Sequence, residues 1–305
     1  MLDIIGVGDA SVDLIIKVDH LPGHDEKVRG ELLGKYPGGI IANFCCAASR
    51  FGAKTGIVTT VGDDDFGRIA IRGLAEFGVD QGGLVVKEGE PTYFGVIQLD
   101  STGEKALVVV ETPLLVPSIE DVDVDYLNNA RYVHLTSLDL ELAKFVASSV
   151  NNDVRVSIDI EPTADSGGLD FWEDVLRKLH IVSLNEAGLK ALVRCEDICK
   201  GAKTLLDYGP QIVVITSGAD GVDVFSGDDH FHVPAFKVPV VDTTGAGDCF
   251  NAVFLSGLVK GWDLVKAVNY ANAAAALSIQ HVGARTGLPT EAVTRSFFDS
   301  KTCNR

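Results

Sequence analysis

The chain has 305 residues, of which 46% are hydrophobic and 23% are charged, and its formal net charge is −17. This length is ample for a large hydrophobic core, and α/β enzymes of this size often fold around one sheet. So negative a charge argues against nucleic acid or an anionic membrane as a partner, because both require basic patches.

The N-terminus and the cysteines predict the compartment. Residues 1–5 run directly into an expected strand, without the basic region and the long apolar region of a signal peptide, and we find no membrane-spanning segment. The six cysteines form no Cys-x-x-Cys pair and no zinc-ligand spacing. We therefore expect a cytoplasmic protein with reduced cysteines.

Short apolar runs rich in β-branched residues alternate with segments of helical period through most of the chain. The expected buried strands are residues 2–8, 55–61, 131–135, 155–160, 181–184 and 211–216. The expected helices are residues 66–77, 140–150, 171–178, 186–193, 246–260 and 264–280. This order predicts an α/β fold with a doubly wound, mostly parallel sheet and helices on both faces.

Two stretches depart from this order because their apolar residues alternate with period two. Residues 12–18 form the first stretch, and residues 92–99 pair with 105–110 across 100–103 in the second. These patterns predict a small separate β-sheet. We find no repeat and no linker that would split the chain, so we expect a single domain over residues 1–305.

A turn of small residues precedes the first of the two long C-terminal helices. Its sequence, Asp-Thr-Thr-Gly-Ala-Gly-Asp, occupies residues 242–248. Gly245 and Gly247 allow successive N–H groups to face one anion, and the positive end of the following helix favours negative charge. Asp248 is placed to take a proton from a hydroxyl that attacks a bound phosphate. The pattern favours phosphoryl transfer, and the alternative is a tight turn whose Asp caps a buried helix.

Two other routes to a nucleotide site are excluded by context. Residues 6–11, Gly-Val-Gly-Asp-Ala-Ser, nearly match the dinucleotide-binding fingerprint, but that fingerprint requires a helix directly afterwards. The following residues alternate like a strand, which argues against a Rossmann dehydrogenase. The chain also lacks Gly-x-x-x-x-Gly-Lys-Ser/Thr, which excludes the P-loop route to ATP.

Two motifs carry a resemblance to a known family. Residues 242–248, with their flanks 233–241 and 249–250, resemble the C-terminal signature of the PfkB, or ribokinase-like, carbohydrate kinases. Residues 37–43, Pro-Gly-Gly-Ile-Ile-Ala-Asn, resemble the N-terminal signature of that family. The likeness extends over residues 4–289. It implies a ribokinase-like fold in which the small sheet is a lid over the sugar, with lid segments at approximately 11–36 and 88–112.

The resemblance implies a set of residues around the sugar. Asp13 would accept hydrogen bonds from two sugar hydroxyls, and Asn43 would bond to a substrate hydroxyl. Gly38 and Gly39 would let the sugar approach the backbone and would serve as the lid hinge. The structural alternatives are an Asp on the solvent face of a strand, a plain turn, and a buried amide.

On the nucleotide side, residues 215–221 resemble the family's Thr-x-Gly-x-x-Gly turn, which contacts ribose and phosphates. The matching residues are Thr216, Gly218 and Gly221. Asn272 matches a position that lines the adenine pocket, and its alternative role is to bond to a neighbouring backbone carbonyl.

The resemblance also implies two metal sites. Asn185 matches the first residue of the family's Asn-x-x-Glu motif, which handles phosphate and Mg²⁺ through water, but the fourth position here is Gly188. We expect the adjacent Glu186 to take over that outer-shell role. Asp242 and Thr244 match the side chains of a monovalent cation site that some members use for K⁺, with carbonyls from the loop 282–289. The alternative is that Asp242 only fixes the turn by accepting its N–H groups.

The expected reaction is transfer of the γ-phosphoryl group of Mg·ATP to a hydroxyl of a small sugar, such as a pentose, hexose or ketose. Asp248 is the expected general base, and the amides of Gly245, Ala246 and Gly247 are the expected anion hole. The alternatives are a nucleoside or an acidic or sulfo-sugar as acceptor, and a non-catalytic sugar-binding regulator. Lys27 could meet an anionic group, but we prefer a neutral sugar. A homodimer through the lid is a further expectation.

Overall fold

The computed structural model describes residues 1–100, 105–162 and 168–302. Nine strands form one large sheet in the spatial order β13-β12-β11-β10-β9-β8-β1-β4-β5. In chain order they are β1 (Leu2–Val7), β4 (Thr55–Gly62), β5 (Asp80–Lys87), β8 (Ala130–Thr136), β9 (Arg155–Ile160), β10 (Ile181–Asn185), β11 (Ile212–Thr216), β12 (Val222–Ser226) and β13 (Asp229–Val233). The strands from β5 to β11 are parallel, whereas β12 and β13 are antiparallel additions at one edge.

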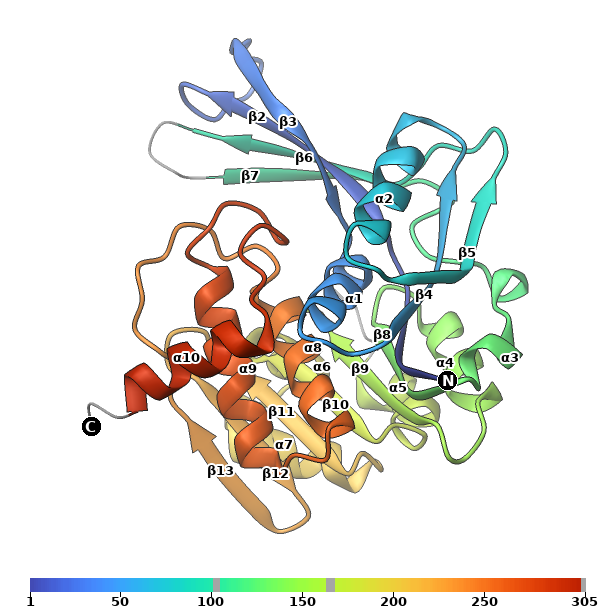
Figure 1. The fold of residues 1–305 in the computed structure, drawn as a ribbon, viewed down its shortest axis with the longest axis vertical. Coiled ribbons are helices and arrows are strands. Elements are labelled where there is room, and N and C mark those ends of the chain that lie inside the picture. The colour runs from blue at the N-terminus through green and yellow to red at the C-terminus, as the bar shows by residue number, and fades with distance from the viewer. Residues whose placement is uncertain (101–104, 163–167, 303–305) are drawn as a thin grey trace.

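Helices cover both faces of this sheet, and each face has its own buried cluster (Figure 1). One cluster is formed with α1 (Ile40–Arg50), α2 (Asp65–Ala75), α8 (Ala246–Val259) and α9 (Leu264–Ser278). The other is formed with α3 (Val124–Leu127), α4 (Leu140–Ser149), α5 (Leu169–Leu176), α6 (Glu186–Val193) and α7 (Ile198–Asp207). The predicted doubly wound α/β fold is therefore confirmed. Within the described residues, no helix is both long and apolar enough to cross a membrane.

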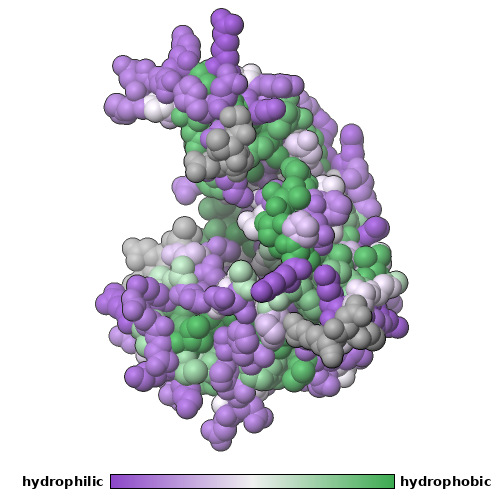
Figure 2. Space-filling view, turned by 90° about the vertical axis from the view of Figure 1, so that its left-hand side faces the viewer, coloured by the Kyte–Doolittle hydropathy of each residue, from purple (hydrophilic) through white to green (hydrophobic). Residues whose placement is uncertain are grey.

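The small sheet has the order β3-β2-β6-β7 and projects from one end of the larger body (Figure 1). Its strands are β2 (Ser11–Val18), β3 (Gly30–Gly38), β6 (Phe94–Leu99) and β7 (Lys105–Val110). The predicted alternating stretches are strands of this sheet, although most of the turn expected at 100–103 lies outside the described residues. The space-filling view shows a hollow between this lid and the body (Figure 2).

Several elements were absent from the sequence-based expectation. The strands are β3, β5, β12 and β13, and the helices are α3, α7 and α10 (Glu291–Thr302). The strands β5 and β13 are the two edges of the large sheet, where one side of a strand has no neighbour. Because edge strands are only partly buried, their apolar pattern is weak.

The order of the strands creates a switch point beside β1. The chain passes from β1 to β4 on one side, and later returns to place β8 on the other side. In open α/β sheets, ligands bind outside the carboxyl ends of the strands at such a point. Asp9 directly follows β1, so the fold places this carboxylate where a ligand site is expected.

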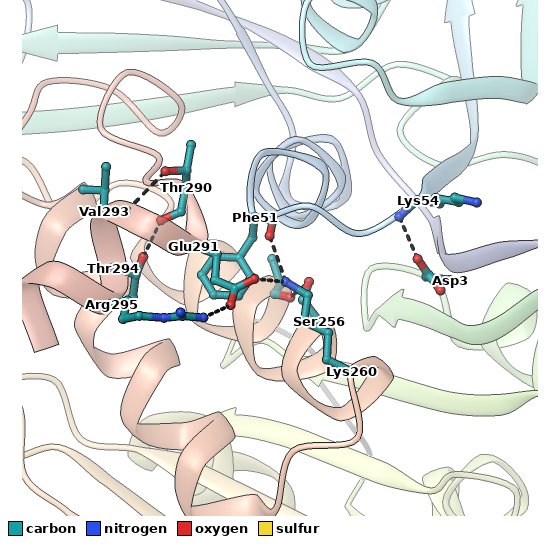
Figure 3. Close-up of polar contacts among 11 residues, drawn as sticks. Asp3, Phe51, Lys54, Ser256, Lys260, Thr290, Glu291, Val293, Thr294 and Arg295 are labelled. Carbon is teal, nitrogen blue, oxygen red and sulfur yellow. Dashed lines mark hydrogen bonds and ion pairs between the residues drawn. The ribbon is translucent and has the colours of Figure 1, made fainter. Parts of the chain in front are cut away.

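The last helix is held by a network around Lys260 (Figure 3). Lys260 Nζ donates hydrogen bonds to the Phe51 carbonyl at 3.1 Å and to Glu291 Oε2 at 2.6 Å. Arg295 Nη2 also bonds to Glu291, at 2.7 Å. The network ties α10 to the ends of α1 and α8, and thereby fixes one end of the loop between α9 and α10.

Candidate active site

The turn at residues 242–248 leads into α8. Gly245 precedes the helix with φ of +75°, a left-handed conformation that favours glycine. A Cβ at Gly245 would lie 2.6 Å from Ala284 Cβ, so the turn also packs closely on the loop before α10. Ala246 N–H donates to the Thr243 carbonyl at 3.2 Å.

Gly247 does not make the turn that we expected of it, because it lies in the first turn of α8. Apart from Gly247 itself, its two chain neighbours and the backbone of its own helix, no atom of the described residues lies within 4 Å of the position that its Cβ would take. The absence of a side chain therefore keeps clear the space beside the helix N-terminus. Such a clear space at a helix N-terminus fits a phosphate group.

Asp242 links the two loops on either side of this turn. Its Oδ1 accepts hydrogen bonds from Thr244 N at 3.0 Å and Thr244 Oγ1 at 2.7 Å, and its Oδ2 accepts from Gly283 N at 2.8 Å. Burial alone would raise the pKa of Asp242, but these hydrogen bonds hold it below its usual value. From the lid, Lys105 Nζ bonds to Thr244 Oγ1 at 3.0 Å and lies 3.7 Å from Asp242 Oδ1.

Asp248, in the first turn of α8, contacts α1, the helix whose first residues belong to the N-terminal motif. Its Oδ2 accepts a hydrogen bond of 3.0 Å from Asn43 Nδ2 on α1. Burial raises the pKa of Asp248 to about 8, and the charges of Asp9 and Glu161 add to this effect. The bond from Asn43 and the charge of Arg285 act in the opposite direction. Asp248 is therefore a more basic carboxylate than an exposed aspartate.

Asp9 organises the start of α1, which has no side-chain cap of its own. Its carboxylate accepts hydrogen bonds from the N–H groups of Ile40 and Ile41 at 3.0 Å, and its carbonyl accepts from Ala42 N at 3.2 Å. Gly39 has φ of +96°, and a Cβ there would lie 2.8 Å from the Asp9 carbonyl. The glycine thus allows the close approach that places Asn43 beside Asp248.

Asp13 lies on β2 between two glycines of neighbouring strands. A Cβ at Gly38 would lie 2.6 Å from Asp13 Oδ2, and a Cβ at Gly95 would lie 3.0 Å from Asp13 Oδ1. Burial raises the pKa of Asp13 to about 6, and the charge of Arg285 opposes this shift. The two missing side chains make room for the Asp13 carboxylate, a group that can accept hydrogen bonds from two hydroxyls of a small ligand.

The expected nucleotide residues line one cavity of about 510 Å³. Its wall includes Thr216, Gly218, Gly221, Gly247 and Asn272, together with apolar side chains such as Phe250 and Ile279. Asn272 Nδ2 donates to the Val233 carbonyl at 3.2 Å, so this residue holds a neighbouring segment as well as lining the cavity. A largely apolar cavity that ends at a helix N-terminus fits a nucleotide base with its phosphates.

Asn185 and Glu186 lie at the start of α6. Asn185 Oδ1 accepts a hydrogen bond of 2.8 Å from Gly188 N, which caps the helix. Asn185 is also paired in register with Thr216, so it ends its strand beside the nucleotide cavity. Glu186 is exposed in the first turn of α6. The described residues contain no group of three or more His, Cys, Asp or Glu side chains arranged to hold a metal.

Comparison with known proteins decides the family. The model of the pfkB family carbohydrate kinases matches residues 1–291 of this chain. The chain belongs to this family. It is therefore a sugar kinase, a phosphotransferase with an alcohol as acceptor.

Several curated relatives of this sugar kinase cover nearly its whole length. An ATP-dependent ribose-1-phosphate kinase from Halopiger xanaduensis is 31% identical over 96% of this chain and 97% of its own. A ribokinase from Bacillus subtilis is 30% identical over 95% and 97%. A fructokinase from Zea mays is 30% identical over 85% and 87%.

Solved structures agree with this assignment. A ribokinase from Arabidopsis thaliana complexed with ribose and ATP has a TM-score of 0.85 and 25% identity, and the match covers 97% of this chain and 98% of that chain. A relative from E. coli with bound ATP and Mg²⁺ has a TM-score of 0.87 and 25% identity, and the match covers 98% and 100% of the two chains. The ribokinase-like fold is thereby confirmed.

The sequence analysis of this kinase missed four charged residues of the site. Asp9, Glu161 and Arg285 act on the charge of Asp248, and Lys105 contacts Thr244 and Asp242. Asp9 and Glu161 follow the ends of β1 and β9, so the rule that sites gather at carboxyl ends of parallel strands would have selected them. Arg285 and Lys105 had no such signal, because a loop arginine and a lid lysine are ordinarily solvated.

Proposed function

We propose that this kinase transfers the γ-phosphoryl group of ATP to a hydroxyl of a small sugar, with Asp248 as general base. One observation carries the proposal. Asp248 lies in the first turn of α8, beside the clear space at Gly247, and its carboxylate bonds to Asn43 of the opposite motif. A single carboxylate is thus next to both the expected phosphate site and the expected sugar site.

The roles of the surrounding residues follow from their chemistry. Asp248 accepts the proton of the attacking hydroxyl, for which its raised pKa is suited. Asp13, Gly39 and Asn43 orient the sugar, and Gly38 leaves room for the Asp13 carboxylate. The N–H groups of Gly245, Ala246 and Gly247 stabilise charge on the transferring group. The N–H group of Ala246 also donates a hydrogen bond to the Thr243 carbonyl. The lid excludes water that would otherwise compete as acceptor.

The nucleotide would occupy the cavity bounded by Thr216, Gly218, Gly221 and Asn272. Mg²⁺ would neutralise phosphate charge when bound. Asn185 ends β10 beside Thr216, and Glu186 begins α6. From these positions, both side chains would contact the water molecules around a bound Mg²⁺.

A neutral pentose, hexose or ketose is the preferred acceptor. A phosphorylated sugar is the second candidate, because the 31% identical relative from Halopiger xanaduensis is a ribose-1-phosphate kinase. The test is ADP release with a panel of ribose, fructose, glucose, ribose 1-phosphate and a nucleoside. One acceptor should give ADP and phosphorylated product in equal amounts. ATP hydrolysis without phosphorylated product, or no ADP release with any acceptor, contradicts the proposal.

Three further properties belong to this proposal. The chain acts as one kinase domain with lid segments near 11–36 and 88–112, in the cytoplasm, where ATP is available and its buried thiols Cys45, Cys46 and Cys249 stay reduced. A homodimer would cover exposed apolar side chains of the lid, namely Leu32, Leu33, Tyr36, Leu107, Val108 and Val109. K⁺ would bind near Asp242 and Thr244 and order the phosphate-binding turn.

A further inference from the structure

Arg285 is an arginine buried in the middle of the kinase, with only 9% of its surface exposed. It bonds to an amide and a carbonyl rather than to a carboxylate. Its Nε donates to Asn43 Oδ1 at 2.8 Å, and its Nη2 donates to the Gly38 carbonyl at 2.7 Å. Burying a guanidinium is costly unless its hydrogen bonds are satisfied, and Nη1 of Arg285 has no partner among the described residues, so such a placement indicates a specific purpose.

The bond to Asn43 fixes the direction of an amide. Because Asn43 Oδ1 accepts from Arg285, its Nδ2 points the other way and donates to Asp248. These two hydrogen bonds thus link Arg285, in the loop before α10, through Asn43 to Asp248, the proposed base. The second bond ties the same guanidinium to Gly38, whose missing side chain makes room for Asp13.

The loop that carries Arg285 also touches the phosphate-binding turn. Gly283 N–H bonds to Asp242, and Ala284 packs against Gly245. Three consecutive residues therefore contact the nucleotide half and the sugar half of the site. Gly73 of α2 completes the arrangement, because a Cβ there would lie 3.1 Å from Arg285 Nη1.

We propose that Arg285 is a positioning residue for phosphoryl transfer. It orients Asn43 toward Asp248 and holds the Gly38 carbonyl, so that the base and the sugar-binding residues keep their positions relative to one another. The proposal rests on the proposed role of Asp248 as base. It concerns the acceptor side, so the nucleotide cavity should be unaffected by loss of Arg285.

The test compares Arg285→Met and Arg285→Lys with the wild type on the best acceptor of the panel. Arg285→Met should lower kcat/KM for the sugar by about ten- to a hundredfold, the loss typical of a misplaced reacting group. The affinity for ADP, measured by calorimetry, should change less than about twofold. Arg50→Met is the matched control, because Arg50 is an exposed arginine that lines, together with Arg285, a cavity between the end of α1 and the loop before α10. The kcat/KM and the ADP affinity of Arg50→Met should match those of the wild type.

A pH profile separates positioning from general support of the fold. Arg285 lowers the pKa of Asp248, so the acid limb of kcat/KM should move to higher pH in Arg285→Met. Arg285→Lys keeps the charge, so its acid limb should stay in place. Its kcat/KM should still fall severalfold, because an ammonium lacks the planar fork that reaches both acceptors. A merely structural arginine would lower the melting temperature without moving the acid limb.

A double-mutant cycle completes the test. If Arg285 acts through Asn43, the loss in Arg285→Met/Asn43→Ala should be clearly smaller than the product of the two single losses. An unshifted acid limb together with kcat/KM within about twofold of wild type in Arg285→Met overturns the proposal, as does full multiplicativity. If Arg285→Met does not fold, wild-type kcat/KM in Arg285→Lys overturns it. A wild type that phosphorylates no acceptor refutes the proposed function instead.

Discussion

Asn43 Nδ2 donates a hydrogen bond of 3.0 Å to Asp248 Oδ2, although the two residues are 205 positions apart in the chain. This contact joins the two family motifs, and it brings α1, which we propose contacts the sugar, against α8, which we propose binds the phosphate. Asn43 therefore orients the carboxylate that we propose as base, and the predictions below follow from that arrangement.

Replacing Asp248 should abolish most turnover while leaving the nucleotide site intact. Asp248→Asn keeps the size of the side chain and removes its ability to accept a proton, so kcat should fall by at least about a hundredfold. Steady-state kinetics measure the turnover, and calorimetry with ADP measures the affinity of the nucleotide site. Asp174→Asn, an exposed aspartate on α5, is the control and should match the wild type. Turnover of Asp248→Asn within threefold of wild type would make Asp248 a structural residue.

The raised pKa of Asp248 predicts the direction of the pH dependence. A general base works only when ionised, so kcat/KM should rise with pH and level off above the pKa of about 8. Asp13, with a pKa of about 6, must also be ionised to accept two hydroxyl bonds. Below about pH 6, two groups lose their charge, so log kcat/KM should fall with a slope that approaches two. A profile that is flat between pH 6 and 8 contradicts the assignment.

Asp13→Ala should act on the sugar and not on ATP. The variant removes the carboxylate between Gly38 and Gly95, so the sugar KM should rise by about tenfold to a hundredfold, as for hydrogen bonds to a charged group. The KM for ATP should change less than twofold. Asp19→Asn, an exposed carboxylate just beyond β2, is the control. Equal damage to both substrates would remove Asp13 from the acceptor site.

The network at Lys260 should contribute to the stability of the kinase rather than to its chemistry. Lys260→Met breaks the bonds to Phe51 and Glu291 (Figure 3), and should lower the free energy of unfolding by about 1–2 kcal/mol. Denaturant unfolding measures this loss, and Lys178→Met, an exposed lysine, is the control. The kcat of Lys260→Met should match that of the wild type. An unchanged unfolding midpoint would show that α10 is held by apolar contacts alone.

The fold was largely predictable from sequence, whereas the contacts within the site were not. Buried strands such as β4 are rich in β-branched residues, which is why their bounds were found within a residue or two. The lid strand β3 is mostly exposed and holds no apolar alternation, so it was missed. The two family motifs contain Asn43 and Asp248, and the wider family resemblance pointed to Asp13.

The missing part of the site depends on long-range packing. No local pattern shows that Arg285 is buried, because its burial comes from Gly38, Asn43 and Gly73 of distant elements. Likewise, Gly247 was expected to bend the chain, and the structure shows that it leaves space beside a helix instead. Sequence motifs thus indicated candidate residues for the site, but not what each one contacts.

Potassium provides the last prediction, and it concerns Asp242. A K⁺ ion near Asp242 and Thr244 would order the turn before reaction, so activity at saturating Mg·ATP should rise severalfold when K⁺ replaces Na⁺. Ionic strength must be held constant, because an acidic protein and an anionic nucleotide both respond to screening. Asp242→Asn should reduce the rise. That variant alone is ambiguous, since Asp242 also accepts the N–H groups of Thr244 and Gly283.

A variant of Lys105 distinguishes the two roles of Asp242, cation binding and support of the turn. The ammonium of Lys105 lies 3.7 Å from Asp242 Oδ1 and bonds to Thr244, so it repels a cation at this place without supporting the turn's backbone. Lys105→Met should therefore lower the K⁺ concentration needed for half activation, because a like charge has been removed. Lys17→Met, on the lid strand β2, should leave it unchanged. A flat response to K⁺ over roughly 1 to 100 mM in wild type and Lys105→Met alike would assign Asp242 to turn architecture only.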